Sequence, residues 1–285
     1  MVDARRPCHH RGVSGTLWLV GTPIGNLGDL PPRAREVLAS VDLVAAEDTR
    51  RTGRLLQGIG LKKKMVSLYD ANERERVDRI VSALHEGWSV ALVSDAGMPL
   101  VSDPGYRLVR ACADEALDVR VVPGPSAVLA ALVVSGLPTD RFTFEGFPPR
   151  KPGERMKRLE ALRSDARTLI FFEAPGRVKT LLRDALVVFG DRRAALCREL
   201  TKRHEEVVRG RISEVLGGLD DDPKGEVVLV IEGAQSPAPV NLAACVEEAQ
   251  ELVRGGMKKR DAARAVADRH GVGVNELYGV LLTSP

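Results

Sequence analysis

The chain has 285 residues, a net charge of +3 and a hydrophobic content of 44%. This length typically corresponds to about two domains, and the composition is that of a globular protein with a buried core. The longest apolar run, residues 127–134, is far shorter than the roughly 20 apolar residues that cross a bilayer, so we expect no membrane span. The four cysteines are scattered without C-x-x-C spacing, which favours a reducing, cytoplasmic compartment.

The first 14 residues are rich in arginine and histidine and lack the apolar segment of a secretory signal. They include Cys8, His9 and His10, whose side chains could bind a metal ion. We interpret residues 1–14 as a disordered basic leader, and we expect no metal site.

Short apolar strands alternate with helical patterns between residues 15 and 136. The predicted strands cover residues 16–20, 41–45, 90–93 and 119–122, and the predicted helices cover residues 33–40, 50–57, 73–86, 106–116 and 127–135. This alternation with short loops predicts an N-terminal domain built on a parallel, doubly wound sheet.

Three of these strands end in turns of small residues, at residues 21–26, 94–105 and 123–127. None of them has the G-x-G-x-x-G or P-loop pattern of a phosphate-binding loop. Because the carboxyl ends of parallel strands meet at one edge of a sheet, we expect the three turns to converge on a ligand site. Asp95 would contribute a carboxylate to that site.

Charged residues also follow the second strand, where Glu47 and Asp48 precede Arg50 and Arg51. They could belong to a site or form an ion-pair cluster at the start of a helix. The helix-cap interpretation is favoured, since Asp48 or Thr49 can cap the helix that follows.

The second half of the chain has a less regular pattern. Residues 137–234 carry strands at 141–147, 168–172, 194–200, 207–210 and 226–231, with helices between them, and predict a second α/β domain with a mixed sheet. Residues 235–285 contain a short linker and three helices that are similar to a helix-turn-helix module. This C-terminal module could bind RNA, or it could pack on the body of the protein or on a second subunit.

Six motifs in order give the chain a specific resemblance to the tetrapyrrole methylase superfamily. They are VGTPIGNL (20–27), AEDTR (46–50), SDAGMP (94–99), VPGPSA (122–127), FEGFP (144–148) and RELTK (198–202). Within the superfamily, the motifs and the C-terminal helices resemble the bacterial 16S ribosomal RNA cytidine 2′-O-methyltransferases. Enzymes that methylate porphyrin precursors carry Gly-Asp-Pro in the central loop, whereas this chain carries Ser-Asp-Ala-Gly-Met-Pro there. This difference from the porphyrin-precursor enzymes favours the RNA branch.

The resemblance implies a two-domain α/β methylase fold, with a parallel N-terminal sheet, a mixed second sheet and a small C-terminal helical module. It implies a homodimer that binds S-adenosylmethionine in the cleft between the two domains. The cofactor-binding positions that it implies are Pro23, Asp95, Ala96, Gly97, Leu100, Val101, Ser102, Ser126, Ala127, Phe172 and Leu200.

The implied reaction is 2′-O-methylation of a cytidine in the decoding region of 16S rRNA, on the small ribosomal subunit. A ribose hydroxyl is a weak nucleophile until its proton is removed, so a positioned base is expected. The candidates are Asp95, Glu173, Glu199 and Lys202, and a lysine would require a lowered pKa to act as a base.

A basic rim could contact the phosphates of the RNA, through Arg150, Lys151, Arg155, Lys202 and Arg203. The alternatives are a tetrapyrrole-precursor C-methyltransferase and a non-catalytic RNA- or ribosome-binding protein that retains the fold.

Overall fold

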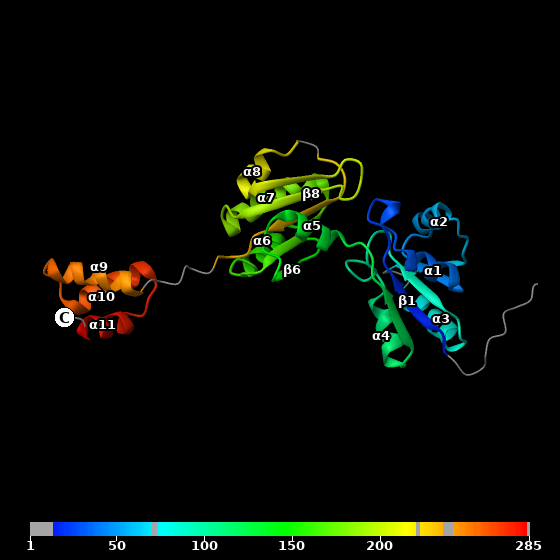
Figure 1. Cartoon of the computed structure of the whole chain (residues 1–285), viewed down its shortest axis with the longest axis horizontal. Helices are drawn as coiled ribbons and strands as arrows, with labels where there is room; N and C mark the ends of the chain where they lie inside the picture. The colour runs from blue at the N-terminus through cyan, green and yellow to red at the C-terminus, as the bar shows by residue number, and fades with distance from the viewer. Residues whose placement is uncertain (1–13, 70–72, 221–222, 236–241, 284–285) are drawn as a thin grey trace, which may run out of the picture. The chain divides into compact units, whose positions relative to one another are not determined.

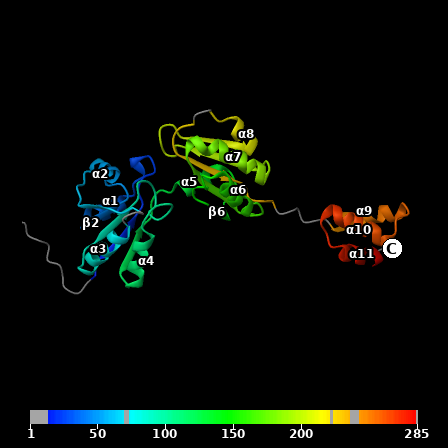
Figure 2. The same ribbon diagram turned by 180° about the vertical axis from the view of Figure 1, so that it is seen from behind.

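A computed structural model describes residues 14–69, 73–220, 223–235 and 242–283 (Figures 1 and 2). The chain forms two compact units, Met1–Gly233 and Ala234–Pro285, and each is considered by itself. The predicted leader lies outside the described residues except for Ser14, and so do residues 236–241 of the predicted linker.

The first sheet of the larger unit is parallel throughout. Its strands are β1 (Thr16–Val20), β2 (Leu43–Ala46), β3 (Met65–Ser67), β4 (Val90–Val93) and β5 (Asp118–Val122). Their order is β3-β2-β4-β1-β5, and every neighbouring pair is parallel, which confirms the predicted doubly wound sheet. The central strands β2 and β4 are buried along their whole length, as expected for strands covered on both faces.

Helices cover both faces of this sheet. Helices α1 (Pro32–Ser40) and α2 (Thr49–Gly58) share a hydrophobic core with one face. Helices α3 (Glu73–His85) and α4 (Tyr106–Asp114) share a separate core with the other. The connections from β1 to α1 and from β4 to α4 therefore leave the sheet at its carboxyl edge, where ligands bind in folds of this class.

The second sheet is mixed, as predicted. Its strands are β6 (Phe142–Phe144), β7 (Thr168–Glu173), β8 (Arg193–Arg198), β9 (Glu206–Arg211) and β10 (Val227–Ile231). Their order is β6-β7-β10-β8-β9, in which only the β6–β7 pair is parallel. Helices α6 (Pro152–Ala161), α7 (Pro175–Phe189) and α8 (Ile212–Gly217) cover one face.

The other face of the second sheet is covered by α5 (Ala127–Ser135). Val128, Ala131 and Leu132 of this helix pack with Ile170 and Val228 of the sheet. The chain therefore passes from the first sheet to the second already at residues 123–126. The predicted domain boundary after residue 136 stays a prediction.

The smaller unit consists of α9 (Leu242–Arg254), α10 (Lys259–His270) and α11 (Val274–Thr283). They enclose a core of their own, which includes Cys245, Val266 and Leu277. Gly271 ends α10 in the left-handed conformation with a φ of 68°, the geometry that glycine adopts most readily after a helix. Across the described ranges, no helix is long and apolar enough to span a membrane.

Candidate functional site

The loops after β1, β4 and β5 meet at the carboxyl edge of the first sheet. Thr22 and Gly97 exchange backbone hydrogen bonds of 2.9 and 3.1 Å between the first two loops. A side-chain carbon on Gly21 would lie 2.7 Å from the Cα atom of Gly124, so the first and third loops touch through glycine backbones. The predicted convergence of the three turns is confirmed.

A cavity of about 380 Å³ lies beside these loops and extends to the edge of the second sheet. Its lining residues are Ile24, Glu47, Arg51, Asp95, Ala96, Val101, Ser102, Asp103, Ala127, Phe147, Phe172, Glu173, Ala174, Pro175, Gly225, Glu226, Val227 and Val228. Both sheets contribute to the wall, and its volume is within the range of small-molecule sites, roughly 300–1,000 Å³.

Six of the predicted cofactor-binding residues line this cavity: Asp95, Ala96, Val101, Ser102, Ala127 and Phe172. The Phe172 ring lies edge-on to Phe144 and Phe147, with ring centroids 4.7 and 5.6 Å apart. These contacts fix an aromatic surface opposite the loop after β4.

The other five predicted cofactor positions, Pro23, Gly97, Leu100, Ser126 and Leu200, are not among the lining residues. Gly97 lies in the bridge to Thr22, and Pro23 follows that bridge. Ser126 caps α5 by accepting a hydrogen bond from the Leu129 N–H, and Leu200 is buried in the core beneath α5. Leu100 adopts a left-handed φ of 72° within the loop after β4.

The loop after β4 has an unusual backbone that buried Glu73 holds in place. Besides Leu100, Ser102 has a φ of 65° and Gly105 a φ of 124°. Glu73 accepts hydrogen bonds from the N–H groups of Gly105 and Arg107, at 3.1 and 3.2 Å. Strained backbone of this kind persists where the surrounding structure over-determines it, and it often marks a functional site.

Asp95 is engaged by the start of α2. It accepts a hydrogen bond of 3.1 Å from the Asp48 N–H and lies 3.4 Å from Nη1 of Arg51. Asp48 itself caps α2 through the Arg50 N–H, at 2.7 Å, which confirms the helix-cap interpretation of Asp48. Its neighbour Glu47 instead lines the cavity.

Glu173 lies at the end of β7, where its side chain is almost completely buried. Its carboxylate pairs with Arg177 one turn into α7 and accepts a hydrogen bond of 2.7 Å from the Ala174 N–H. The negative charge of Glu173 is therefore already neutralised by a cation.

Glu199 and Lys202 form a network with Glu226 beside the cavity. The Lys202 ammonium group donates to Glu199 at 2.8 Å and lies 3.2 Å from Glu226, whose N–H donates to Glu199. Burial lowers the pKa of Lys202, but these hydrogen bonds outweigh it and the net direction is upward. The hydrogen bonds from Lys202 and the Glu226 N–H hold the pKa of Glu199 below its usual range.

This geometry does not favour Lys202 as the general base. A lysine acts as a base only when its pKa is lowered, and the two carboxylates favour the protonated ammonium form instead. The Lys202 ammonium group instead forms ion pairs with Glu199 and Glu226.

Asp103 is a carboxylate of the cavity wall that the sequence analysis missed. Burial, together with the charges of Glu47 and Asp95, raises its pKa to about 6 despite a hydrogen bond with Ser94. The Ser94–Gly105 stretch contains two aspartates, and only three-dimensional packing distinguishes the environment of the second. In the sequence, the position of Asp103 before Pro104 and Gly105 does not distinguish it from an ordinary loop aspartate.

The predicted basic rim is only partly available to a polyanion. Arg150, Lys151 and Arg203 are exposed, and Lys151 lies 3.1 Å from Glu154. Arg155 is 6% exposed and its guanidinium binds Asp184 at 2.6 Å as well as two backbone carbonyls. The RNA-contact hypothesis for Arg155 is therefore corrected to a structural role.

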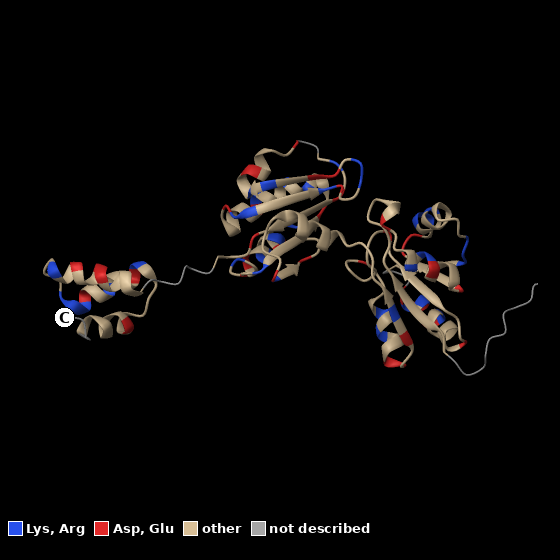
Figure 3. Ribbon diagram, in the orientation of Figure 1, with Lys and Arg blue, Asp and Glu red and all other residues tan. Residues whose placement is uncertain are grey.

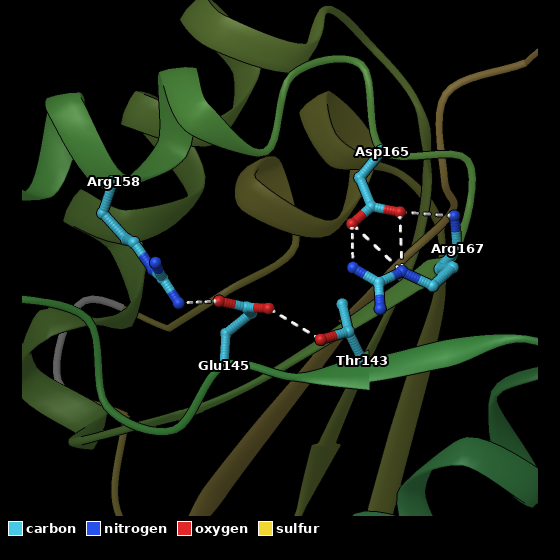
Figure 4. Close-up of polar contacts among 5 residues, drawn as sticks. All are labelled: Thr143, Glu145, Arg158, Asp165 and Arg167. Atoms are coloured by element: carbon cyan, nitrogen blue, oxygen red, sulfur yellow. Dashed lines mark hydrogen bonds and ion pairs between the residues drawn. The ribbon is translucent and has the colours of Figure 1, made fainter.

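Further cations of this region are neutralised in the same way. Figure 4 shows Arg158 directed at Glu145, whose other oxygen accepts a hydrogen bond of 2.8 Å from Thr143. In a separate pair, Arg167 binds Asp165. Basic and acidic residues are both spread over the elements (Figure 3), although α2 carries Arg50, Arg51 and Arg54 and no acidic residue. Among the described residues, no group of three His, Cys, Asp or Glu side chains could hold a metal ion.

This chain is similar in sequence to a known family and to curated relatives that share one printed name. The family model of the tetrapyrrole (corrin/porphyrin) methylases matches residues 16–216. A ribosomal RNA small subunit methyltransferase I from Mycobacterium tuberculosis is 45% identical over 275 residues, which cover 95% of this chain and 96% of that one. A protein of the same name from Thermotoga maritima is 46% identical over 222 residues, covering 78% of this chain and 100% of the relative.

Solved structures share the fold at lower identity. The uroporphyrin-III-C-methyltransferase from Thermus thermophilus superimposes with a TM-score of 0.53 at 23% identity, covering 77% of this chain and 92% of that one. This likeness concerns the fold alone.

Proposed function

This chain belongs to the tetrapyrrole methylase family, and from that premise we propose that it 2′-O-methylates a cytidine in the decoding region of 16S rRNA, with S-adenosylmethionine as the methyl donor. The observation that carries the proposal is the 45% identity to a ribosomal RNA small subunit methyltransferase I over 95% of the chain. The cavity at the carboxyl edge of the first sheet is the site to which we assign the reaction.

The cavity suits S-adenosylmethionine in size and chemistry. Its wall combines the apolar surfaces of Ile24, Val101 and Phe172, against which an adenine ring could pack. The carboxylates of Glu47 and Asp95 line the same cavity, and their charge complements a sulfonium cation. Small residues such as Ala96 and Ala127 leave room for a ligand against the backbone.

S-adenosylmethionine supplies an activated methyl group when it is bound. The residues of this chain then have to orient the ribose oxygen in line with the methyl carbon, exclude water and accept a proton. The rigid loop after β4, held by Glu73, and the aromatic surface around Phe172 provide two fixed walls for this alignment. Rigid walls favour catalysis because orientation is set before the reaction.

Exposed cations support an RNA substrate. Arg150, Lys151 and Arg203 are exposed. Contacts of this kind position the phosphate backbone and contribute to affinity without reading the sequence. Phe147, which lines the cavity and is 56% exposed, could stack on a base.

We also propose that the protein forms a homodimer. Leu129 and Val133, one turn apart on α5, and Val121 on the edge strand β5 are exposed apolar side chains of the larger unit. Burial against a second copy would remove this apolar surface from water. The molar mass in solution tests the proposal, and a monomer at micromolar concentration contradicts it.

The tetrapyrrole alternative lacks such support. It requires a large apolar cavity, whereas the wall of this cavity carries five carboxylates, Glu47, Asp95, Asp103, Glu173 and Glu226. The relatives at 43–46% identity are named as ribosomal RNA methyltransferases.

The test is methyl transfer from labelled S-adenosylmethionine to small ribosomal subunits that lack the modification. We expect the label in 2′-O-methylcytidine after digestion to nucleosides. Label in a base or in large-subunit RNA contradicts the proposal. Binding to small subunits with no transfer supports the non-catalytic alternative instead.

A matched pair of variants tests whether the cavity binds the methyl donor. Ala96→Leu adds bulk to the cavity wall, at a cost of about 1–3 kcal/mol if the ligand must shift, or roughly tenfold or more in donor affinity. Ala113→Leu adds the same bulk on the exposed surface of α4 and should leave binding and transfer unchanged. Equal behaviour of the two variants in calorimetry would place the donor elsewhere.

A further inference from the structure

Asp103 differs from three other carboxylates of the cavity wall, Asp95, Glu173 and Glu226, in what surrounds its charge. Asp95 lies beside Arg51, Glu173 pairs with Arg177, and Glu226 lies 3.2 Å from Lys202. Asp103 lines the same cavity, and the charges that raise its pKa are the carboxylates of Glu47 and Asp95.

The position of Asp103 in the fold is fixed on both sides. Ser102 before it has a left-handed φ of 65°, and Gly105 after it has a φ of 124°. Any side chain at Gly105 would meet Leu92 Cδ2 at 2.6 Å, and Glu73 binds the Gly105 N–H. The backbone on both sides of Asp103 is therefore constrained, and Asp103 lines the cavity.

A carboxylate that already binds a cation is a poor proton acceptor, because the cation stabilises its ionised form. A carboxylate that is partly buried near like charges gains affinity for a proton and becomes an effective base near neutral pH. The four base candidates suggested by the sequence are all held by cations or, in the case of Lys202, are cationic themselves. Asp103 has the opposite environment.

We propose that Asp103 is the general base that accepts the proton of the ribose 2′-hydroxyl. The assignment rests on the proposed function and extends it to a residue. As the 2′-oxygen forms its bond with the methyl carbon, the carbon–sulfur bond breaks and its electron pair stays on sulfur. The hydroxyl proton passes to a carboxylate oxygen of Asp103, so the products are 2′-O-methylribose, S-adenosylhomocysteine and a neutral carboxyl group.

The surroundings of Asp103 determine the expected pH dependence. Glu47 from the end of β2 and Asp95 from the end of β4 raise its pKa, while Arg51 of α2, which also lines the cavity, offsets part of the charge of Asp95. Glu173 and Glu226 line the cavity from the second sheet, each beside its own cation. We therefore expect kcat/KM to rise with pH through an apparent pKa of about 6 and to level off above it.

The experiment compares Asp103→Asn with Asp114→Asn, an exposed aspartate of α4 outside the cavity. Asp103→Asn should lower kcat by about 10²–10⁴-fold and abolish the rise of kcat/KM with pH near pH 6. Donor affinity measured by calorimetry should stay within a few-fold of wild type. Asp103→Glu should retain partial activity, with the rise of kcat/KM shifted to a different pH. Asp114→Asn should behave as wild type.

Three results would contradict the assignment. The first is wild-type turnover in Asp103→Asn, and the second is an unchanged pH dependence of its turnover. The third is a loss of donor affinity by the same factor as turnover, which would make Asp103 a donor-binding residue. Wild-type protein that binds S-adenosylmethionine and labels no RNA overturns the proposed function, and the base with it. If the wild-type protein and Asp103→Asn label the RNA equally, the proposed function stands and only the assignment of Asp103 as the base is overturned.

Discussion

Gly25 is the residue at which the loop after β1 touches the segment that follows β8. A side-chain carbon placed on Gly25 would lie 2.4 Å from Cγ of Lys202, 2.9 Å from Oγ1 of Thr201 and 3.1 Å from the Leu200 carbonyl oxygen. Both Glu199 and Thr201 have left-handed φ values, 51° and 65°, so this segment has little freedom to move aside. The absence of a side chain at Gly25 thus lets the Lys202 network approach the first sheet.

Gly25→Ala should therefore displace Lys202 and weaken the network with Glu199 and Glu226. Overpacking of this kind typically costs about 1–3 kcal/mol of unfolding free energy, and we expect KM for the RNA substrate to rise as well. Gly153→Ala is the control, because a side chain there meets nothing within 4 Å and lies in the first turn of α6. Urea unfolding and steady-state kinetics check both variants, and an unaffected Gly25→Ala would refute the steric argument.

At the same scale, the sequence predicts which residues are near the cavity better than it predicts their roles. The small-residue turns led to Asp95, Ala96 and Ala127 because a ligand loop requires small side chains at a strand end. The protonation state of each acid instead depends on cations from distant parts of the chain, such as Arg51 for Asp95 and Arg177 for Glu173. Spacing along the chain does not reveal these pairs, and this explains why Asp103 was missed.

Among the elements, helix α3 holds the loop after β4 through Glu73, the first residue of the helix. Glu73 is 7% exposed, binds the Gly105 and Arg107 N–H groups with one oxygen and lies 3.2 Å from Arg107 Nε with the other. A helix that packs by Val77, Ile80 and Leu84 against the sheet is a rigid support for such contacts. The orientation of the loop after β4 is in this way set by a helix that precedes the strand.

Glu73→Ala should leave two N–H groups without their acceptor and loosen the loop. A lost hydrogen bond to a buried group costs about 1–3 kcal/mol, and kcat should fall because Asp103 is no longer fixed. Glu75→Ala on the same helix removes an exposed ion pair with Arg79, worth about 0.3–0.5 kcal/mol, and serves as the control. Equal loss of stability and activity in the two variants would show that Glu73 does not position the loop.

The secondary structure followed from local patterns except where tertiary pairing determines it. The buried strand β4 and helix α5 have the predicted bounds, because apolar runs and Gly or Pro boundaries mark them. Strand β3 has three residues and exists through its pairing with β2, and α8 is a six-residue helix between β9 and the loop before β10. Neither is long enough to show a hydrophobic period of its own.

On the scale of the whole molecule, the reaction and the C-terminal helices are assigned to different units. Both sheets and all lining residues of the cavity belong to the unit Met1–Gly233. The helices α9, α10 and α11 have a separate core. The Thermotoga maritima relative of the same printed name is matched over its full length by 222 residues, about a fifth fewer than this chain contains.

Deleting residues 236–285 should therefore leave the donor site intact. We expect S-adenosylmethionine to bind the shortened protein with an affinity within about twofold of the full chain, since the lining residues all precede the deletion. Calorimetry on both proteins checks this, and loss of binding would show that the C-terminal unit completes the site. The same pair of proteins separates the two interpretations of the helical module: a raised KM for small subunits with an unchanged molar mass indicates RNA binding, whereas conversion of a dimer to a monomer indicates subunit packing.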